Sequence, residues 1–104
     1  MEVQSFSERI FNMLLQIPKG HVVTYGQLAA LVGHPGASRA VGNVLHNNLF
    51  PDIFPCFRVV NSQGKLAKNF GAGGITEHRR RLLEDGIEVV DDCVNLSVYQ
   101  WKKF

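Results

Sequence analysis

Long apolar runs are missing from this chain of 104 residues. No stretch approaches the roughly 18–20 residues that a membrane-spanning helix needs. The N-terminal residues are polar and acidic, whereas a signal peptide needs a basic start followed by an apolar stretch. The sequence therefore predicts a cytoplasmic protein without a membrane anchor. With 45% hydrophobic residues, the chain can form one packed core, and its length predicts a single domain over residues 1–104.

Cysteines and metal-ligand patterns are also scarce. The two cysteines, Cys56 and Cys93, show no CxxC or other ligand spacing, and a reducing compartment would keep both as thiols. The four histidines form no i, i+4 pair and no cluster with cysteine, and they are His21, His34, His46 and His78. The spacing predicts neither a disulfide framework nor a metal site.

Acidic side chains are rare in the middle of the chain. Between Arg9 and Thr76 the only acid is Asp52, against six lysines and arginines. A segment so poor in carboxylates suits a polyanion such as nucleic acid. A fold can nevertheless spread such charge over several faces, so charge alone leaves nucleic-acid binding open.

Two capping boxes mark helix starts near the N-terminus. Ser5 is followed three residues later by Glu8, and an apolar stripe from Phe6 to Ile17 then predicts a helix over residues 5–17. Thr24 and Gln27 repeat the box and open a short helix through Val32. After a Gly/Pro turn, residues 37–47 form a third helix whose buried side holds Ala37, Val41, Val44 and Leu45. Two short helices joined by a tight turn indicate a helix-turn-helix.

The exposed side of that third helix carries only small or hydrogen-bonding groups and one cation. Arg39, Gly42, Asn43 and His46 lie at i, i+3, i+4 and i+7. A glycine inside a helix costs about 1 kcal/mol relative to alanine. Gly42 therefore indicates either the close approach of another backbone or tight packing on a neighbouring helix.

The second half of the chain begins with a long irregular segment. Residues 48–75 show no sustained periodicity and include a glycine-rich stretch. A helix is then expected from Thr76 to Asp85, with Leu82 and Leu83 facing inward. Residues 87–96 show the alternation and Asp-Asp turn of a hairpin, and Tyr99 and Trp101 are expected to pack the tail onto the body. The predicted fold is mainly α with a small β-hairpin, a winged helix-turn-helix.

Five phrases in the same order carry a resemblance to a known family: Val23-Thr24-Tyr25-Gly26-Gln27-Leu28-Ala29, Ser38-Arg39-Ala40-Val41-Gly42, Pro55-Cys56-Phe57-Arg58-Val59-Val60-Asn61-Ser62, Gly73-Gly74 and Leu82-Leu83-Glu84-Asp85-Gly86. Together they resemble the C-terminal DNA-binding domain of the O6-alkylguanine-DNA alkyltransferases and their relatives, the alkyltransferase-like proteins. The length and the tail from Tyr99 to Trp101 are closer to the alkyltransferase-like proteins.

The resemblance implies a protein that enters the minor groove of DNA and flips O6-alkylguanine into a pocket. Arg39 matches the arginine that fills the gap left by the base, and Tyr25 matches the tyrosine that presses on the adjacent phosphate. Further DNA contacts are expected from Gly42, Asn43 and His46. Cys56 matches the alkyl acceptor of a single-turnover transfer that needs no cofactor. The implied base pocket comprises Pro55, Cys56, Phe57, Arg58, Val59, Phe70 and Gly71.

The chain departs from the family at the groups that activate the chemistry. Phe57 replaces the histidine that removes the thiol proton, and the carboxylate behind that histidine would be Asp85 or Glu84. Phe70 replaces a tyrosine, and Gly71 or Ala72 replaces a serine. A phenyl ring accepts no proton, so the general-base route is closed unless another group supplies it. The alternative for Cys56 is a small buried hydrophobe.

Three functions follow as hypotheses. The first is a stoichiometric repair transferase that uses Cys56, and the retained thiol favours it. The second is a damage sensor that binds O6-alkylguanine without efficient transfer and signals to nucleotide excision repair proteins. The third is a helix-turn-helix regulator, which would need base-reading side chains and usually a dimerisation element. The first two predict a monomer bound to duplex DNA that contains O6-alkylguanine.

Overall fold

The computed structural model describes residues 5–68, 70 and 73–102. Helix α1 (Phe6–Leu14) is followed by β1 (Val23–Thr24), α2 (Tyr25–Leu31) and α3 (Ser38–His46). A 3-10 turn, η1 (Cys56–Arg58), leads into β2 (Val59–Val60) and α4 (Gly74–Glu84). The chain ends with β3 (Val89–Val90), β4 (Cys93–Val94) and α5 (Leu96–Tyr99). Among the described residues, no helix is long and apolar enough to span a membrane.

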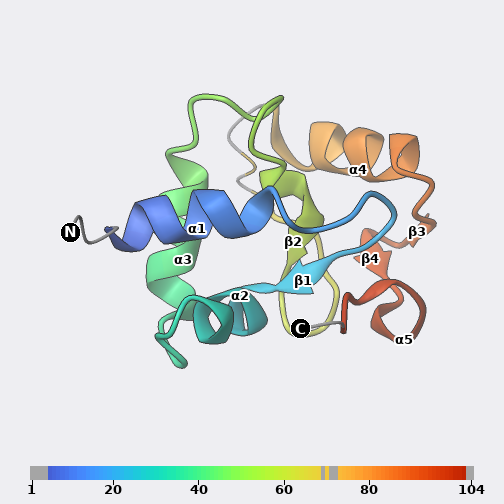
Figure 1. Cartoon of the computed structure of the whole chain (residues 1–104). Coiled ribbons are helices and arrows are strands. Elements are labelled where there is room, and N and C mark those ends of the chain that lie inside the picture. Colours follow the sequence, from blue (N-terminus) through green and yellow to red (C-terminus); the bar gives the residue numbers. More distant parts are fainter. Residues whose placement is uncertain (1–4, 69, 71–72, 103–104) are drawn as a thin grey trace.

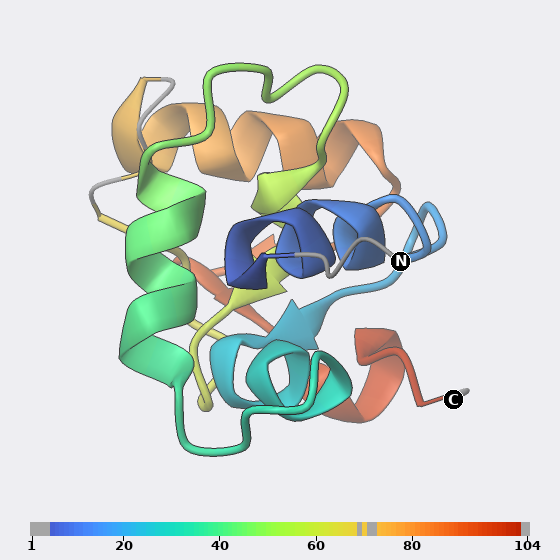
Figure 2. The same cartoon turned by 60° about the vertical axis from the view of Figure 1, so that its left-hand side comes forward.

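Helix α1 lies in the middle of the molecule, with α2, α3 and α4 around it (Figures 1 and 2). Its buried face contributes Ile10 and Leu14 to the core, which α2 and α4 complete with Leu28 and Leu82. The core therefore joins the helix-turn-helix of α2 and α3 to the later part of the chain.

Both capping boxes are confirmed. The Ser5 hydroxyl accepts a hydrogen bond from the Glu8 amide, and the Thr24 hydroxyl accepts one from the Gln27 amide. In each pair the side chain at the third helical position accepts from the capping residue's amide in return. These reciprocal bonds satisfy amides that the first turn of a helix leaves without partners.

The described residues form two short sheets of two strands each, and the first joins distant parts of the chain. Strands β1 and β2 pair in parallel, with Val23 opposite Val59 and Thr24 opposite Val60. Strands β3 and β4 form the expected hairpin. Asp91 and Asp92 occupy its turn with φ of 52° and 57°. A two-residue turn of this kind requires positive φ at both positions, and aspartate tolerates this better than most residues.

The hairpin is attached to the preceding loop at Gly64. The Val94 amide donates to the Gly64 carbonyl at 2.8 Å. A Cβ at Gly64, where φ is 83°, would lie 2.2 Å from the Val94 carbonyl oxygen. Only glycine allows the loop to approach the hairpin this closely.

Several expected boundaries and orientations were wrong. The first helix ends at Leu14 rather than residue 17. Helix α4 begins at Gly74, and its N-cap is Gly73, with φ of 116°, rather than Thr76. Leu83 is 52% exposed, whereas Leu82 is buried, because neighbouring residues on a helix point about 100° apart. Leu96 begins a helical turn instead of extending the hairpin.

The tail packs on the body as expected. The Trp101 amide donates to the Val22 carbonyl, and the Val22 amide donates to the Tyr99 carbonyl, at 2.8 and 2.9 Å. Gln27 adds a bond from its side chain to the Trp101 carbonyl at 2.5 Å. The end of the chain is thereby tied to the start of the helix-turn-helix.

Candidate nucleic-acid interface and base cavity

Helix α3 presents the predicted stripe outward. Arg39, Asn43 and His46 are exposed, and Gly42 lies between them. A Cβ added at Gly42 would meet no atom within 4 Å. Packing on a neighbouring helix therefore does not explain this glycine, and the surface above it is open for a partner's backbone.

A cavity of about 400 Å³ borders this stripe and is lined in part by Cys56. We call it the Cys56 cavity. Its walls come from the start of α2, from α3, from η1, from the loop before α4 and from α4 itself: Tyr25, Gly42, Asn43, Leu45, His46, Cys56, Ala67, Lys68, Phe70 and His78. The volume lies within the range of small-molecule sites in proteins, roughly 300–1,000 Å³.

The structure brings together six of the expected site residues in this cavity: Tyr25, Gly42, Asn43, His46, Cys56 and Phe70. Arg39 borders a second cavity of about 520 Å³, which also reaches Tyr25 and Gly42. Tyr25 and Gly42 thus stand between the two. Gly71 lies outside the described residues.

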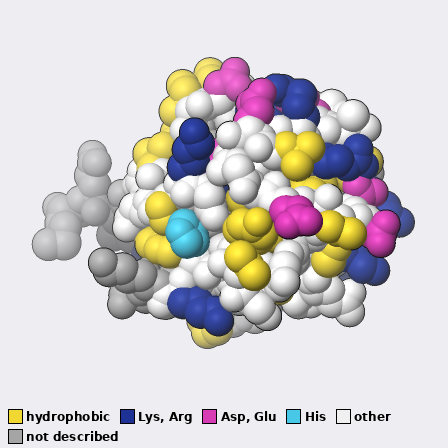
Figure 3. Space-filling view, turned by 90° about the vertical axis from the view of Figure 1, so that its right-hand side faces the viewer, with side chains coloured by type: hydrophobic (Ala, Val, Ile, Leu, Met, Phe, Trp, Pro, Cys, Tyr) yellow, Lys and Arg dark blue, Asp and Glu magenta, His cyan; other side chains and the backbone are white. Residues whose placement is uncertain are grey.

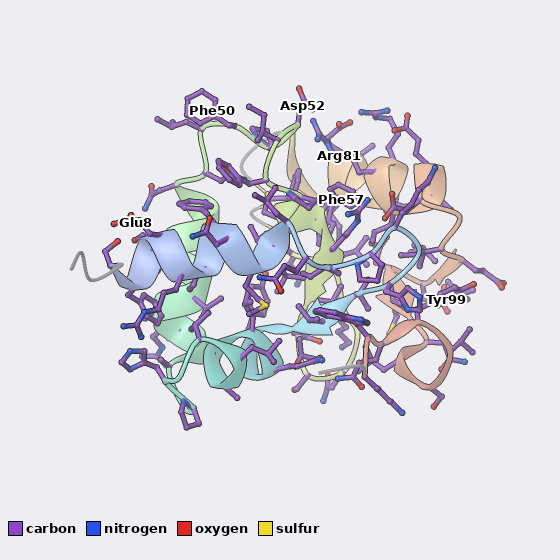
Figure 4. All side chains as sticks on the ribbon, in the orientation of Figure 1. Glu8, Phe50, Asp52, Phe57, Arg81 and Tyr99 are labelled. Atoms are coloured by element: carbon purple, nitrogen blue, oxygen red, sulfur yellow. The ribbon has the colours of Figure 1, made fainter. Side chains whose placement is uncertain are left out.

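Four other expected pocket residues do not line the Cys56 cavity: Pro55, Phe57, Arg58 and Val59. Pro55 precedes the η1 turn, and Val59 is buried in β2. Phe57 lies in the body of the molecule, whereas Phe50 and Asp52 lie at the outer edge of the preceding loop (Figure 4). Phe57 itself is buried and packs against the Arg58 guanidinium, 5.2 Å from its ring centre.

The Arg58 side chain is held by the carboxylate of Asp85. Its Nε and Nη2 donate to the two oxygens of Asp85 at 2.7 and 3.1 Å, and its Nη1 donates to the Ile17 carbonyl at 3.0 Å. Glu84 points elsewhere, is 65% exposed and pairs with Arg80. Of the two carboxylates considered from the sequence, Asp85 is the one joined to the cysteine-bearing turn, through Arg58.

Burial governs the protonation of Cys56. Its side chain is 9% exposed, and desolvation raises the pKa of the thiol, while a hydrogen bond with Asn48 and the charge of Arg81 oppose the rise. Burial also raises the pKa of Tyr25, and the neighbouring Cys56 adds to this rise. At neutral pH Cys56 is therefore a thiol, which is a much weaker nucleophile than a thiolate.

His78 is a site residue that the sequence analysis missed. It is fully buried on α4. The Phe57 carbonyl oxygen lies 2.7 Å from its Nε2, and its Nδ1 accepts a hydrogen bond from the Ala67 amide at 3.1 Å. Its ring stacks on Phe70, with centres 4.8 Å apart. The spacing to buried Leu82, four residues later, was the available signal that His78 faces inward.

No group of three histidine, cysteine or carboxylate side chains that could hold a metal ion occurs in the part of the chain that the structure describes. Figure 3 shows the side of the molecule that lies on the right of Figure 1, where the hairpin is. On this face the lysine and arginine side chains are intermixed with aspartate and glutamate side chains. That face carries no single-sign basic patch of the kind that nucleic acids favour.

Residues 5–87 match the family model of the 6-O-methylguanine DNA methyltransferase, DNA binding domain. The chain is 38% identical to a DNA base-flipping protein of Vibrio parahaemolyticus, over 96% of this chain and 99% of that protein. It is also 38% identical to a bifunctional methyltransferase/endonuclease of Thermoplasma volcanium over 91% of this chain, but it spans only 30% of that relative's length.

The crystal structure of Atl1 from Schizosaccharomyces pombe, in complex with damaged DNA containing O6-carboxymethylguanine, superposes with a TM-score of 0.87 at 31% identity. The superposition covers 99% of this chain and 100% of Atl1. The family model and the structural superposition agree, and the chain belongs to the family of the 6-O-methylguanine DNA methyltransferase DNA-binding domain.

Proposed function

We propose that this protein binds duplex DNA through α3, receives a flipped O6-alkylguanine in the Cys56 cavity and acts in the repair of that lesion. The observation that carries the proposal is the position of Cys56 on the wall of a cavity that the α3 stripe borders. The complex of Atl1 with damaged DNA supports the same use of the fold. A reducing compartment such as the cytoplasm would keep Cys56 free for this role.

The side chains around the two cavities suit the steps of base flipping. Arg39 is exposed beside the second cavity and forms no ion pair with any described residue, so its guanidinium is available to fill the gap left by the base. Tyr25 lines both cavities, and we assign it the role of pressing on the phosphate beside the flipped base. Phe70 offers an aromatic surface on which the extruded guanine can stack.

In the transfer hypothesis, the Cys56 sulfur attacks the alkyl carbon, a new S–C bond forms and the bond from that carbon to guanine O6 breaks. The thiol loses its proton and the guanine regains one, so no cofactor is consumed. The raised pKa of Cys56 slows the first step, because little thiolate exists at neutral pH. We therefore expect one slow turnover per molecule.

A damage sensor without efficient transfer is the second candidate. Both ring nitrogens of His78 already have backbone partners, and Asp85 is held by Arg58. Neither can therefore replace the missing histidine as a base in this arrangement. Such a sensor would act as a monomer on DNA and pass the lesion to nucleotide excision repair proteins.

Intact-protein mass spectrometry after incubation with duplex DNA that contains O6-methylguanine tests the transfer. Wild type should gain one methyl group slowly, and Cys56→Ser should gain none. A parallel binding titration compares the affinity for this duplex with that for an undamaged one. Arg80→Ala is the control, because Arg80 is an exposed residue of α4 that lines neither cavity. Selective binding without added mass would leave the sensor, and equal affinity for both duplexes would refute the proposed function.

A further inference from the structure

Three separate parts of the Cys56 cavity meet at one side chain. The imidazole of His78 contacts the backbone of η1 through the Phe57 carbonyl, the loop before α4 through the Ala67 amide, and the ring of Phe70 by stacking. The Phe57 carbonyl belongs to the residue directly after Cys56. His78 therefore connects the turn that carries the thiol to the aromatic ring of Phe70, which lines the same cavity.

The two hydrogen bonds require one protonation state. The Ala67 amide can only donate, so Nδ1 must be unprotonated, and the Phe57 carbonyl can only accept, so Nε2 must carry the hydrogen. The neutral Nε2–H tautomer satisfies both partners. A second proton on the ring would set two N–H groups against each other across the 3.1 Å between Nδ1 and the Ala67 nitrogen.

We propose that His78 is the positioning residue of the Cys56 cavity, and that its protonation in mild acid opens the cavity and removes selectivity for the alkylated base while binding to undamaged DNA persists. The inference rests on the proposed function, because it concerns the same cavity. It adds a residue and a pH response to that site.

The surroundings of His78 offer little to stabilise an imidazolium ion. The titratable residues that line the cavity with His78 are Tyr25, His46, Cys56 and Lys68, and no described lining residue is a carboxylate. On η1, Arg58 is neutralised by Asp85, and on α4 the neighbouring Glu77 is paired with Arg80 and Arg81. Burial accordingly lowers the pKa of His78, although the Phe57 carbonyl opposes the shift.

The stacked pair of Phe70 and His78 explains why the effect should reach the lesion. Their rings are inclined by only 20°, so the imidazole plane sets the plane of the phenyl ring that faces the cavity. Loss of the Ala67 bond frees the imidazole to turn, and Phe70 with it. A flipped base would then lose its stacking surface, whereas the exposed α3 stripe that meets the DNA would stay in place.

The first test compares binding of an O6-methylguanine duplex and an undamaged duplex by fluorescence anisotropy between pH 5 and pH 8. For wild type, the ratio of the two affinities should fall by about tenfold in mild acid, equivalent to about 1.4 kcal/mol. His78→Gln, which can still donate to the Phe57 carbonyl but does not titrate, should give a lower ratio that is independent of pH. His34→Gln removes an exposed histidine that lines neither the Cys56 cavity nor the second cavity, and it should keep the wild-type ratio and its fall.

A second measurement needs no DNA. Long-range ¹H–¹⁵N spectra of wild type should show the Nε2–H tautomer of His78 at pH 7, and its titration should shift the Ala67 amide. A wild type that is selective for the lesion to the same degree at every pH, the same fall in His78→Gln, or the Nδ1–H tautomer would overturn the role of His78. Absence of lesion selectivity at every pH would instead refute the proposed function, while the spectra would still decide the role of His78.

Discussion

Replacement of Asp85 by alanine should strongly destabilise the protein. The Asp85 side chain is 7% exposed and accepts bonds from Arg58 at 2.7 and 3.1 Å and from the Gly20 amide at 3.3 Å. Its removal leaves the Arg58 guanidinium, itself 17% exposed, without a counter-ion. Breaking a buried ion pair from one side costs about 3–5 kcal/mol.

The partial exposure of Arg58 places the expected loss at the lower end, about 3 kcal/mol. For a domain of this size, that loss should lower the melting temperature by roughly 12–24 °C. Urea unfolding followed by circular dichroism measures the free energy, and calorimetry measures the melting temperature. Glu84→Ala is the matched control, because this neighbouring carboxylate forms only an exposed pair with Arg80, for which a loss of about 0.5 kcal/mol or less is expected.

The double variant Arg58→Ala with Asp85→Ala completes a thermodynamic cycle. If Arg58 and Asp85 form the ion pair, the sum of the stability losses of the two single variants should exceed the loss of the double variant. The second substitution then no longer leaves a buried charge without its partner. The reasoning would be refuted by an Asp85→Ala variant as stable as Glu84→Ala. Additive effects of the two substitutions would contradict the ion pair in the same way.

Three further predictions concern the proposed site. Since burial favours the neutral thiol, the rate at which iodoacetamide modifies Cys56 should be low at pH 7 and should still rise above pH 9, at higher pH than the rate for glutathione. The same dependence of the two rates on pH would contradict the raised pKa. Phe57→His should accelerate methyl transfer by less than about tenfold, below the usual 10²–10⁴-fold effect of a general base, because Arg58 retains Asp85; a larger gain in the mass-spectrometric assay would show that Asp85 is available. Arg39→Ala should reduce the affinity ratio between damaged and undamaged duplexes, and an unchanged ratio would remove the guanidinium from the mechanism.

Local signals in the sequence predicted the parts of the fold that depend on neighbours within a few residues. A capping box needs only a hydroxyl and a carboxyl or amide group three residues apart, so Ser5 and Thr24 were enough to predict where their helices begin. The Asp-Asp turn predicted the hairpin in the same way, because the conformation of a two-residue turn depends on those two residues. The ordered phrases around Tyr25, Arg39 and Cys56 likewise sufficed to identify the family.

Contacts between distant residues decided the rest. Nothing near Asp85 in the sequence shows that Arg58, 27 positions earlier, holds it. The pairing of β1 with β2 joins segments that are still further apart, with Val23 opposite Val59. Which of two adjacent leucines is buried depends on where α4 rests on the body, and only Leu82 faces the core.

The sequence by itself determined the family, the helix-turn-helix and the presence of a cysteine at the position that the resemblance gives to the alkyl acceptor, because these depend on residue identity and local spacing. Only the tertiary structure decided that Cys56 lines a cavity, that burial raises the pKa of its thiol and that His78 contacts Phe57, Ala67 and Phe70. Burial and hydrogen-bond partners arise from segments that meet in space, and these control the protonation on which the chemistry depends.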